Sequence, residues 1–345
     1  MTKVLFSRIL LIALLLLPGY AQGMRLKSYH DMVLLYGGGA HRNYVWDIQH
    51  VNPYVTYTDR SGNEKWMFDA FLMLEIHNGR GLTFATGYTK EPATQADWQK
   101  LADYFLQKDL CLGALNLAIE AAKGRIGNPP TKRKIVIGLP EPMKGQKNWG
   151  NAAGKQLDLA DDNDRIAACK WYIDYVCKKF KSMKYKNLEL AGFYWIAEEA
   201  TNTRSIINCV GSYLNKHKLS FNWIPWFRSD GFDEWKALGF NYAYLQPNYF
   251  FDDKIPYSRL NEACSLAKEF DLDMEMEFDE RIQSGWGYRL DDYMKAFKEN
   301  GCWQTKRLAY YQGSTALYDL YMSQKPEDKE LYHRFCDFVV NHPVK

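Results

Sequence analysis

The sequence predicts an α/β protein, a single-domain (β/α)8 TIM barrel that follows an N-terminal signal peptide. Three observations indicate this fold: short β-rich runs alternate with helical patterns between Met32 and Gly313, several of these runs are almost continuously apolar, and no linker divides the chain. Such alternation is typical of parallel strands joined by crossover helices, and apolar runs are typical of strands buried on both faces. The roughly 320 residues after the signal fit one barrel with insertions, because a barrel needs about 250.

Residues 1–23 are predicted to be a secretory signal, and the barrel domain is expected over residues 24–345. Lys3 and Arg8 precede an apolar run at 9–17, Pro18 and Gly19 break that run, and small residues follow. This order is typical of a signal peptide, and the run is too short to span a bilayer comfortably. We therefore expect a secreted or periplasmic protein with no stable membrane insertion.

Eight strands are expected, each a β-rich run bounded by turn residues or by a helical pattern. In chain order they are residues 32–36, 68–76, 135–139, 188–196, 221–227, 242–246, 273–278 and 307–312. The long segment 40–65, between the first two strands, is expected to be an insertion or a partly β loop.

Helical periodicity separates most of these strands and predicts the outer layer of the barrel. The expected helices are residues 97–107, 115–123, 164–181, 203–216, 257–270 and 290–300, with a closing helix at 325–340. Asp97 and Asp164 are the predicted N-caps, because Asp side chains accept hydrogen bonds from the first free backbone amides of a helix.

Two of the predicted strands end in acidic residues. Glu198 and Glu199 follow the strand at 188–196, and the strand at 273–278 carries Glu275 and Glu277, with Asp279 directly after it. The alternation of a strand places these last three acids on one face, and burying three charges against the apolar helix layer would cost several kcal/mol each. We expect this face to line the barrel interior or its upper rim, where the alternative to a functional site is a charged network that fills the barrel.

Two carboxyl groups from separate strand ends are what cleavage of a glycosidic bond requires. One holds a proton for the leaving oxygen, and the other stays ionised to attack the sugar or to activate water. Glu198 continues the alternation of Tyr194 and Ile196, so we favour Glu198 over Glu199 as the acid/base; either residue could instead cap the following helix. Glu277, nearer the carboxyl end of its strand, is the predicted nucleophile.

Other polar and aromatic residues near the predicted strand ends are candidates to bind substrate, because all eight strand ends meet on one face of a barrel. A sugar ring has CH groups on its faces and hydroxyls at its edge, so it needs both kinds of side chain. Besides Glu199, Glu275 and Asp279, the candidates are His41, Arg228, Gln246, Asn248, Tyr311, Trp195, Trp226, Tyr249 and Trp286.

Two short segments carry a resemblance to known proteins: Phe193-Tyr194-Trp195 followed by Glu198, and the run 275–279. The chain resembles an uncharacterised domain-of-unknown-function family of exported bacterial, glycoside-hydrolase-like TIM barrels. It is also similar to the large clan of retaining glycosidases, and that similarity implies Glu198 as acid/base and Glu277 as nucleophile. The clan often has Asn before its acid/base Glu, whereas this chain has Ala197; Gln246 or Asn248 could take over the hydrogen bond to a sugar hydroxyl.

Several other classes of function find no support in the sequence. The net charge of +3 comes without a dense Lys/Arg stripe, which argues against nucleic acid as a partner. The seven histidines form no His-x-x-x-His pair and no nucleotide-binding spacing is complete, so no metal or other cofactor is expected. The seven cysteines form no compact framework and are expected to be buried free thiols.

The sequence therefore predicts an exported glycoside hydrolase that acts on a poly- or oligosaccharide through two carboxyl groups, with retention of configuration as the implication of the resemblance. The alternative is a barrel that binds glycan without cleaving it. A third and weaker hypothesis is a non-glycan hydrolase or a surface scaffold.

Overall fold

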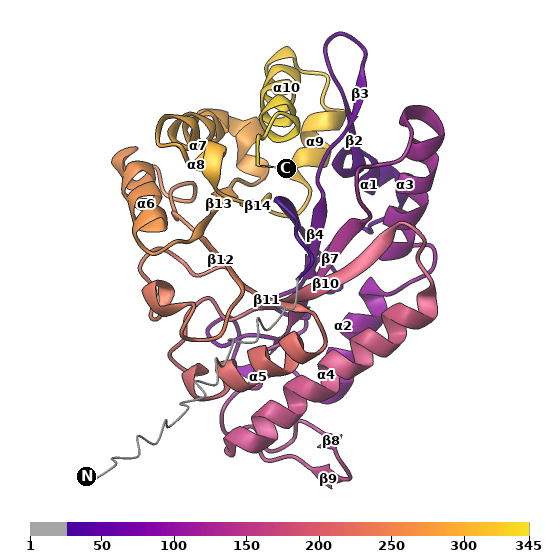
Figure 1. Ribbon diagram of the computed structural model, residues 1–345, viewed down its shortest axis with the longest axis vertical. Coiled ribbons are helices and arrows are strands. Elements are labelled where there is room, and N and C mark those ends of the chain that lie inside the picture. The colour runs from indigo at the N-terminus through magenta and orange to yellow at the C-terminus, as the bar shows by residue number, and fades with distance from the viewer. Residues whose placement is uncertain (1–25, 345) are drawn as a thin grey trace, which may run out of the picture.

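The structure is a computed structural model that describes residues 26–344. Within these residues, eight parallel strands close into a barrel in which consecutive long strands are neighbours (Figure 1). The strands are β1 (Asp31–Tyr36), β4 (Ala70–Leu74), β7 (Arg133–Leu139), β10 (Leu188–Trp195), β11 (Ser220–Trp223), β12 (Tyr242–Leu245), β13 (Asp273–Glu277) and β14 (Leu308–Tyr311). The predicted TIM barrel and all eight predicted strands are confirmed.

Helices form the outer layer around these strands (Figure 1). They are α2 (Gln95–Phe105), α3 (Leu112–Ile126), α4 (Asp162–Met183), α5 (Arg204–Lys216), α6 (Ser258–Glu269), α7 (Gly287–Glu299), α8 (Cys302–Thr305), α9 (Ala316–Met322) and α10 (Pro326–Val340). The seven predicted helices are all present. Between β11 and β12 the described chain has only the short 3-10 helix η1 (Phe232–Glu234).

Both predicted N-caps were wrong. Thr94 is the N-cap of α2, and Asp97 lies one turn later and accepts a hydrogen bond from the Thr94 backbone N–H at 3.0 Å. In the same way Asp161 caps α4, with Asp164 in the first turn. In both cases the acid lies inside the first turn, where it still faces the positive end of the helix dipole.

The insertion after β1 was only partly foreseen. It contains a hairpin of β2 (Thr56–Thr58) and β3 (Glu64–Trp66), which agrees with the expected partly β loop. It also contains α1 (Ile48–Val55), which was not predicted and is capped by Asp47. Two short strand pairings occur in loops of the described chain: β5 (Leu82–Thr83) pairs with β6 (Glu91–Pro92), and β8 (Asn151–Ala152) pairs with β9 (Lys155–Gln156). Two isolated bridges join His77 to Thr83 and Trp226 to Gln246.

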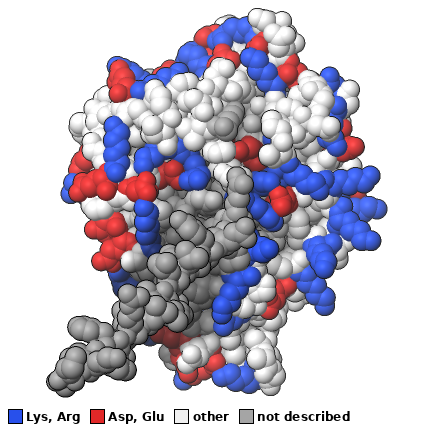
Figure 2. Space-filling model, in the orientation of Figure 1, with Lys and Arg blue, Asp and Glu red and all other residues white. Residues whose placement is uncertain are grey.

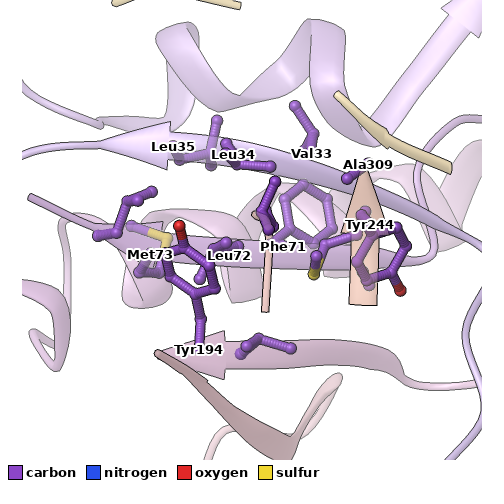
Figure 3. Close-up of a cluster of buried hydrophobic side chains, with 14 of the residues drawn as sticks. Val33, Leu34, Leu35, Phe71, Leu72, Met73, Tyr194, Tyr244 and Ala309 are labelled. Atoms are coloured by element: carbon purple, nitrogen blue, oxygen red, sulfur yellow. The ribbon is translucent and has the colours of Figure 1, made fainter. Parts of the chain in front are cut away.

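Figure 3 shows a cluster of buried hydrophobic side chains of the barrel strands that includes Leu34, Met73 and Tyr194. Leu34 of β1, Met73 of β4 and Tyr194 of β10 are at most 2% exposed. By the two-residue period of a strand, the faces that carry Leu34 and Met73 also carry Tyr36 and Glu75 at the strand ends. The packed interior therefore leads directly into the residues at the carboxyl ends of the strands.

The seven cysteines are all free thiols. Cys111, Cys169, Cys264, Cys302 and Cys336 are buried, as predicted, whereas Cys177 is half-buried and Cys209 is exposed. In the interior such thiols behave as small apolar side chains.

The surface carries charges of both signs, and on the face shown in Figure 2 basic and acidic side chains both occur across the molecule. Between residues 26 and 344, no helix combines the length and the hydropathy needed to cross a bilayer. The predicted secretory signal at 1–23 lies outside the described residues.

Gly192 lies where β10 and β11 approach each other closely. It also lies next to a shift of register in the pairing of β10 with β7. A Cβ atom at this position would lie 2.1 Å from Ser220 Oγ and 2.3 Å from the Ser220 backbone oxygen. We expect Gly192→Ala to lower the free energy of unfolding by about 3 kcal/mol, the upper end of the usual cost of overpacking, because a backbone atom cannot rotate away. Urea denaturation measures the change.

The control for this prediction is Gly124→Ala in α3, where an added Cβ atom would meet nothing within 4 Å. This change should raise the free energy of unfolding by about 0.5–1 kcal/mol, because Ala loses less backbone entropy than Gly in a helix. Equal effects of the two substitutions would contradict the packing argument.

Candidate active site

A cavity of about 310 Å³ lies at the carboxyl ends of the barrel strands. This is the face on which TIM-barrel enzymes build their active sites. Its lining combines carboxyl, amide and aromatic side chains with a single guanidinium among the described residues, namely Leu34, Tyr36, Arg42, Glu75, Ile76, His77, Tyr88, Tyr194, Glu198, Gln246, Asn248, Phe251, Glu275, Glu277 and Tyr311.

Both predicted catalytic residues, Glu198 and Glu277, line this cavity. Four of the predicted substrate-binding residues join them: Glu275, Gln246, Asn248 and Tyr311. The other eight do not line it, and they are Glu199, Asp279, Arg228, His41, Trp195, Trp226, Tyr249 and Trp286. Of the two adjacent acids after β10, only Glu198 therefore faces the cavity.

Two of the charged residues outside the cavity, Asp279 and Arg228, have partners of their own. Asp279 caps the 3-10 helix η2 (Glu280–Ser284) and binds Arg281 at 2.8 Å. Arg228 is exposed and pairs with Glu262. His41 lies just behind the cavity wall, since its ring stacks on that of His77 with 4.2 Å between centroids. Burial lowers the pKa of His41.

The predicted aromatic platforms lie elsewhere. Trp195 is fully buried and packs on Phe221, on the side of β10 opposite Tyr194. The Tyr249 hydroxyl donates to Asp292, and Trp286 packs against Phe250. Trp226 is 39% exposed outside the cavity. The aromatic rings that do line the cavity are Tyr36, Tyr88, Tyr194, Phe251 and Tyr311.

Glu277 ends β13 and is held by two strong donors. Its Oε2 atom accepts hydrogen bonds from the Tyr293 hydroxyl at 2.6 Å and from the Asn248 backbone N–H at 2.7 Å. The pKa of Glu277 is raised to about 7, because burial and, to a smaller extent, the nearby Glu198 raise it more than these hydrogen bonds lower it. The backbone of Asn248 is left-handed, with a φ of 49°, a conformation that Asn tolerates better than most residues. In this conformation its N–H donates to Glu277.

Glu198, beyond the end of β10, has weaker partners. Its Oε1 atom accepts a hydrogen bond from Gln246 Nε2 at 2.9 Å, and its Oε2 atom accepts one from the Tyr88 hydroxyl at 3.2 Å. Burial raises the pKa of Glu198 and these two donors lower it in part. A raised pKa lets a carboxyl group keep its proton near neutral pH, which is the requirement for a general acid.

Two amide side chains connect the two carboxyl groups. Asn248 Nδ2 lies 3.3 Å from Gln246 Oε1 and 3.5 Å from Glu277 Oε1, while Gln246 donates to Glu198. Glu198, Gln246, Asn248 and Glu277 thus form one hydrogen-bonded chain along the cavity wall. Each carboxyl group is oriented by the same amide pair.

The half-buried Arg42 and the buried Glu75 form an ion pair on another wall of the cavity. Arg42 Nε lies 2.7 Å from Glu75 Oε2, and Arg42 Nη2 lies 2.8 Å from Glu75 Oε1. Arg42 Nη1 donates to Ser314 Oγ at 2.9 Å. The Glu75 side chain is fully buried, so this two-point contact compensates its charge.

Sequence reasoning missed Arg42, Glu75, His77 and Tyr88. Glu75 carried a signal, since it is an acid within the otherwise apolar predicted strand at 68–76. Arg42 and Tyr88 come from the long loops after β1 and β4, whose path no local pattern determines. Within residues 26–344, no cluster of three or more His, Cys, Asp and Glu side chains is arranged to hold a metal ion.

The fold and this cavity define a TIM-barrel protein with several carboxyl groups at the mouth of its barrel. The chain belongs to the family described as Domain of unknown function (DUF4855), whose family model matches residues 31–337. Comparison with curated proteins found no match.

Solved structures with a similar fold include two groups of glycosidases. A protein of Bacteroides thetaiotaomicron assigned as an α-L-fucosidase has a TM-score of 0.48 and 14% identity, over 98% of both chains. A family GH18 chitinase catalytic domain from the fern Peteris ryukyuensis has a TM-score of 0.47 and 11% identity, over 90% of this chain and 100% of that one.

Tryptophan synthase α-subunit of Pyrococcus furiosus, which has a different activity, is also among the matches, with a TM-score of 0.37 and 9% identity, over 93% of this chain and 99% of that one. The matches therefore concern the barrel and carry no information on substrate.

Proposed function

We propose that the protein is an exported glycoside hydrolase that cleaves an oligo- or polysaccharide, with Glu198 as acid/base and Glu277 as nucleophile. The observation that carries this proposal is the placement of these two carboxyl groups, from separate strand ends, on one cavity and on one amide chain. Export is proposed from the signal pattern in residues 1–23.

The hydrogen bonds favour this division of roles. Glu277 receives a phenol, a backbone amide and a side-chain amide, all of which stabilise its ionised form. Glu198 receives one amide and one longer phenol contact, so hydrogen bonding stabilises its ionised form less than that of Glu277. In the first step Glu198 would protonate the leaving oxygen while Glu277 attacks the anomeric carbon.

In the second step a water molecule would attack the glycosyl-enzyme ester, with Glu198 taking its proton, and release the sugar and Glu277. Tyr36, Tyr194 and Tyr311 line the cavity, and their rings would contact the CH groups of the sugar. Gln246 and Asn248 would meet its hydroxyls, in place of the Asn that the similar clan often has before its acid/base.

The test is release of reducing sugar from a panel of plant, microbial and host glycans by the wild type and by the double variant Glu198→Gln/Glu277→Gln. We expect the wild type to cleave at least one glycan and the double variant to lose that activity while keeping its fold. The exposed Glu269→Gln change on α6 should leave the rate unchanged.

A glycan that is bound equally by the wild type and the double variant, and cleaved by neither, would instead support the non-catalytic glycan-binding barrel. Cleavage that survives in the double variant would contradict the assignment of the two catalytic groups.

A further inference from the structure

The carboxyl groups of the cavity outnumber its cations. Four Glu residues line it, and the guanidinium of Arg42 is the one permanent positive charge among the described lining residues. That guanidinium is already bound at two points to Glu75. Glu198, Glu275 and Glu277 are therefore left with no cationic partner in the described part of the chain.

Glu275 is the least satisfied of the three. Its side chain lines the cavity and is 2% exposed, yet neither of its carboxyl oxygens has a hydrogen bond or ion pair with any residue in 26–344. A buried polar group without a partner is costly, and such groups in a cavity are commonly satisfied by what the cavity binds.

The titratable groups around Glu275 supply no positive charge either. They are Glu277 on its own strand, Glu198 after β10, Tyr194 of β10, Tyr311 of β14 and Tyr293 of α7. Burial raises the pKa of Glu275 well above its ordinary value, and the charges of Glu277 and Glu198 add to that shift. The surroundings of Glu275 therefore favour its neutral form.

We propose that the cavity takes an amino sugar with a free ammonium group, and that Glu275 is the counter-ion of this group. An ammonium has three donors and a positive charge, so it satisfies a carboxylate that has no other partner. This inference rests on the proposed function in taking the ligand to be a sugar. It names the class of that sugar as non-acetylated hexosamine.

The same contacts disfavour the opposite class, sugars with a carboxylate or sulfate group. Arg42 is not available to bind an anion, because its Nε and Nη2 atoms donate to both carboxyl oxygens of Glu75 and its Nη1 atom donates to Ser314. An anion in this cavity would meet three carboxyl groups without a cationic partner, while an ammonium would supply the positive charge that they lack. The volume of about 310 Å³ is at the small end for ligand pockets, which fits a sugar unit.

Binding of an ammonium has a consequence for protons. The bound positive charge favours ionised Glu275, whereas the surroundings in the free protein favour its neutral form, so binding of an ammonium should release a proton. The N-acetyl form of the same sugar lacks the charge and should release none. This difference separates a counter-ion from a carboxyl group that merely donates a hydrogen bond to a hydroxyl.

The experiment is isothermal titration calorimetry of the full chain at pH 7, in two buffers of different ionisation enthalpy. The ligands are glucosamine and galactosamine, each compared with its N-acetyl form and its parent hexose. These monosaccharides contain no glycosidic bond, so cleavage does not interfere. The proteins are the wild type, Glu275→Gln, and Glu269→Gln as the exposed control.

We expect at least one of the two amines to bind at least about 10-fold more tightly than its N-acetyl form and its hexose, with proton release. Glu275→Gln should lose this preference, while Glu269→Gln should keep it. Equal affinity of amine, N-acetyl form and hexose for the wild type, including no binding of any of them, would overturn the inference. So would a preference that persists in Glu275→Gln with its fold intact.

Failure of this inference is distinguishable from failure of the proposed function. Cleavage that depends on Glu198 and Glu277, without any preference for amines, would remove the amino sugar and leave the hydrolase. A preference for amines that depends on Glu275, without cleavage of any glycan, would leave a binding site for amino sugars and remove the hydrolase.

Discussion

Glu277→Ala is expected to lower kcat at least about 10⁴-fold on the glycan that the wild type cleaves, because the variant has no group to form the covalent bond to the sugar. Sodium azide should restore part of the rate, since a small anion fits the space left by the carboxyl group. It would attack the anomeric carbon directly and give a glycosyl azide of inverted configuration. The products are identified by NMR.

Glu198→Ala is the matched comparison for this prediction. Its loss should be smaller, about 10²–10⁴-fold, and smallest for substrates with an acidic leaving group that need no proton. Here azide would attack the glycosyl-enzyme and give a glycosyl azide of retained configuration. If azide produces the same configuration in both variants, or neither variant responds to it, the proposed retaining roles of Glu198 and Glu277 are wrong.

Arg42→Met is expected to lower the free energy of unfolding by about 3–5 kcal/mol, which is the usual cost of leaving one member of a buried ion pair alone. The Glu75 side chain is fully buried and would lose both of its contacts with the guanidinium. Urea denaturation measures the change.

The double variant Arg42→Met/Glu75→Gln serves as the control, because it removes the uncompensated charge together with its partner. We expect it to recover most of the lost stability. If the single and double variants are equally unstable, then the packing of the Arg42 side chain, rather than the charge of Glu75, is what holds this wall of the cavity.

Much of the barrel could be predicted because its signals are local. The strands with long apolar runs, such as β7 and β10, are buried on both faces, so their hydrophobic patterns are strong. The alternation of side chains along a strand also indicated that Glu198, rather than Glu199, faces the cavity. The predicted end of β11 was too late, because pairing stops at Trp223, shortly before Pro225, which has no N–H to donate.

The substrate-binding predictions were less complete, because a position at a strand end does not determine where a side chain points. Arg228 and Trp286 follow strands as expected, yet Arg228 reaches out to Glu262 and Trp286 packs against Phe250. Each of these contacts depends on a residue more than thirty positions away in the chain.

The sequence by itself determined the order of the strands and helices, the acidic character of two strand ends and the shared face of Glu275 and Glu277, and it favoured Glu198 over Glu199. Only the tertiary structure decided that Glu75 and Arg42 join these acids, that Gln246 and Asn248 connect Glu198 to Glu277, and that Glu275 is left without a partner. The physical reason is range: backbone periodicity and burial act over a few neighbouring residues, whereas charge compensation and hydrogen bonding in the cavity depend on loops and strands that meet only when the barrel closes.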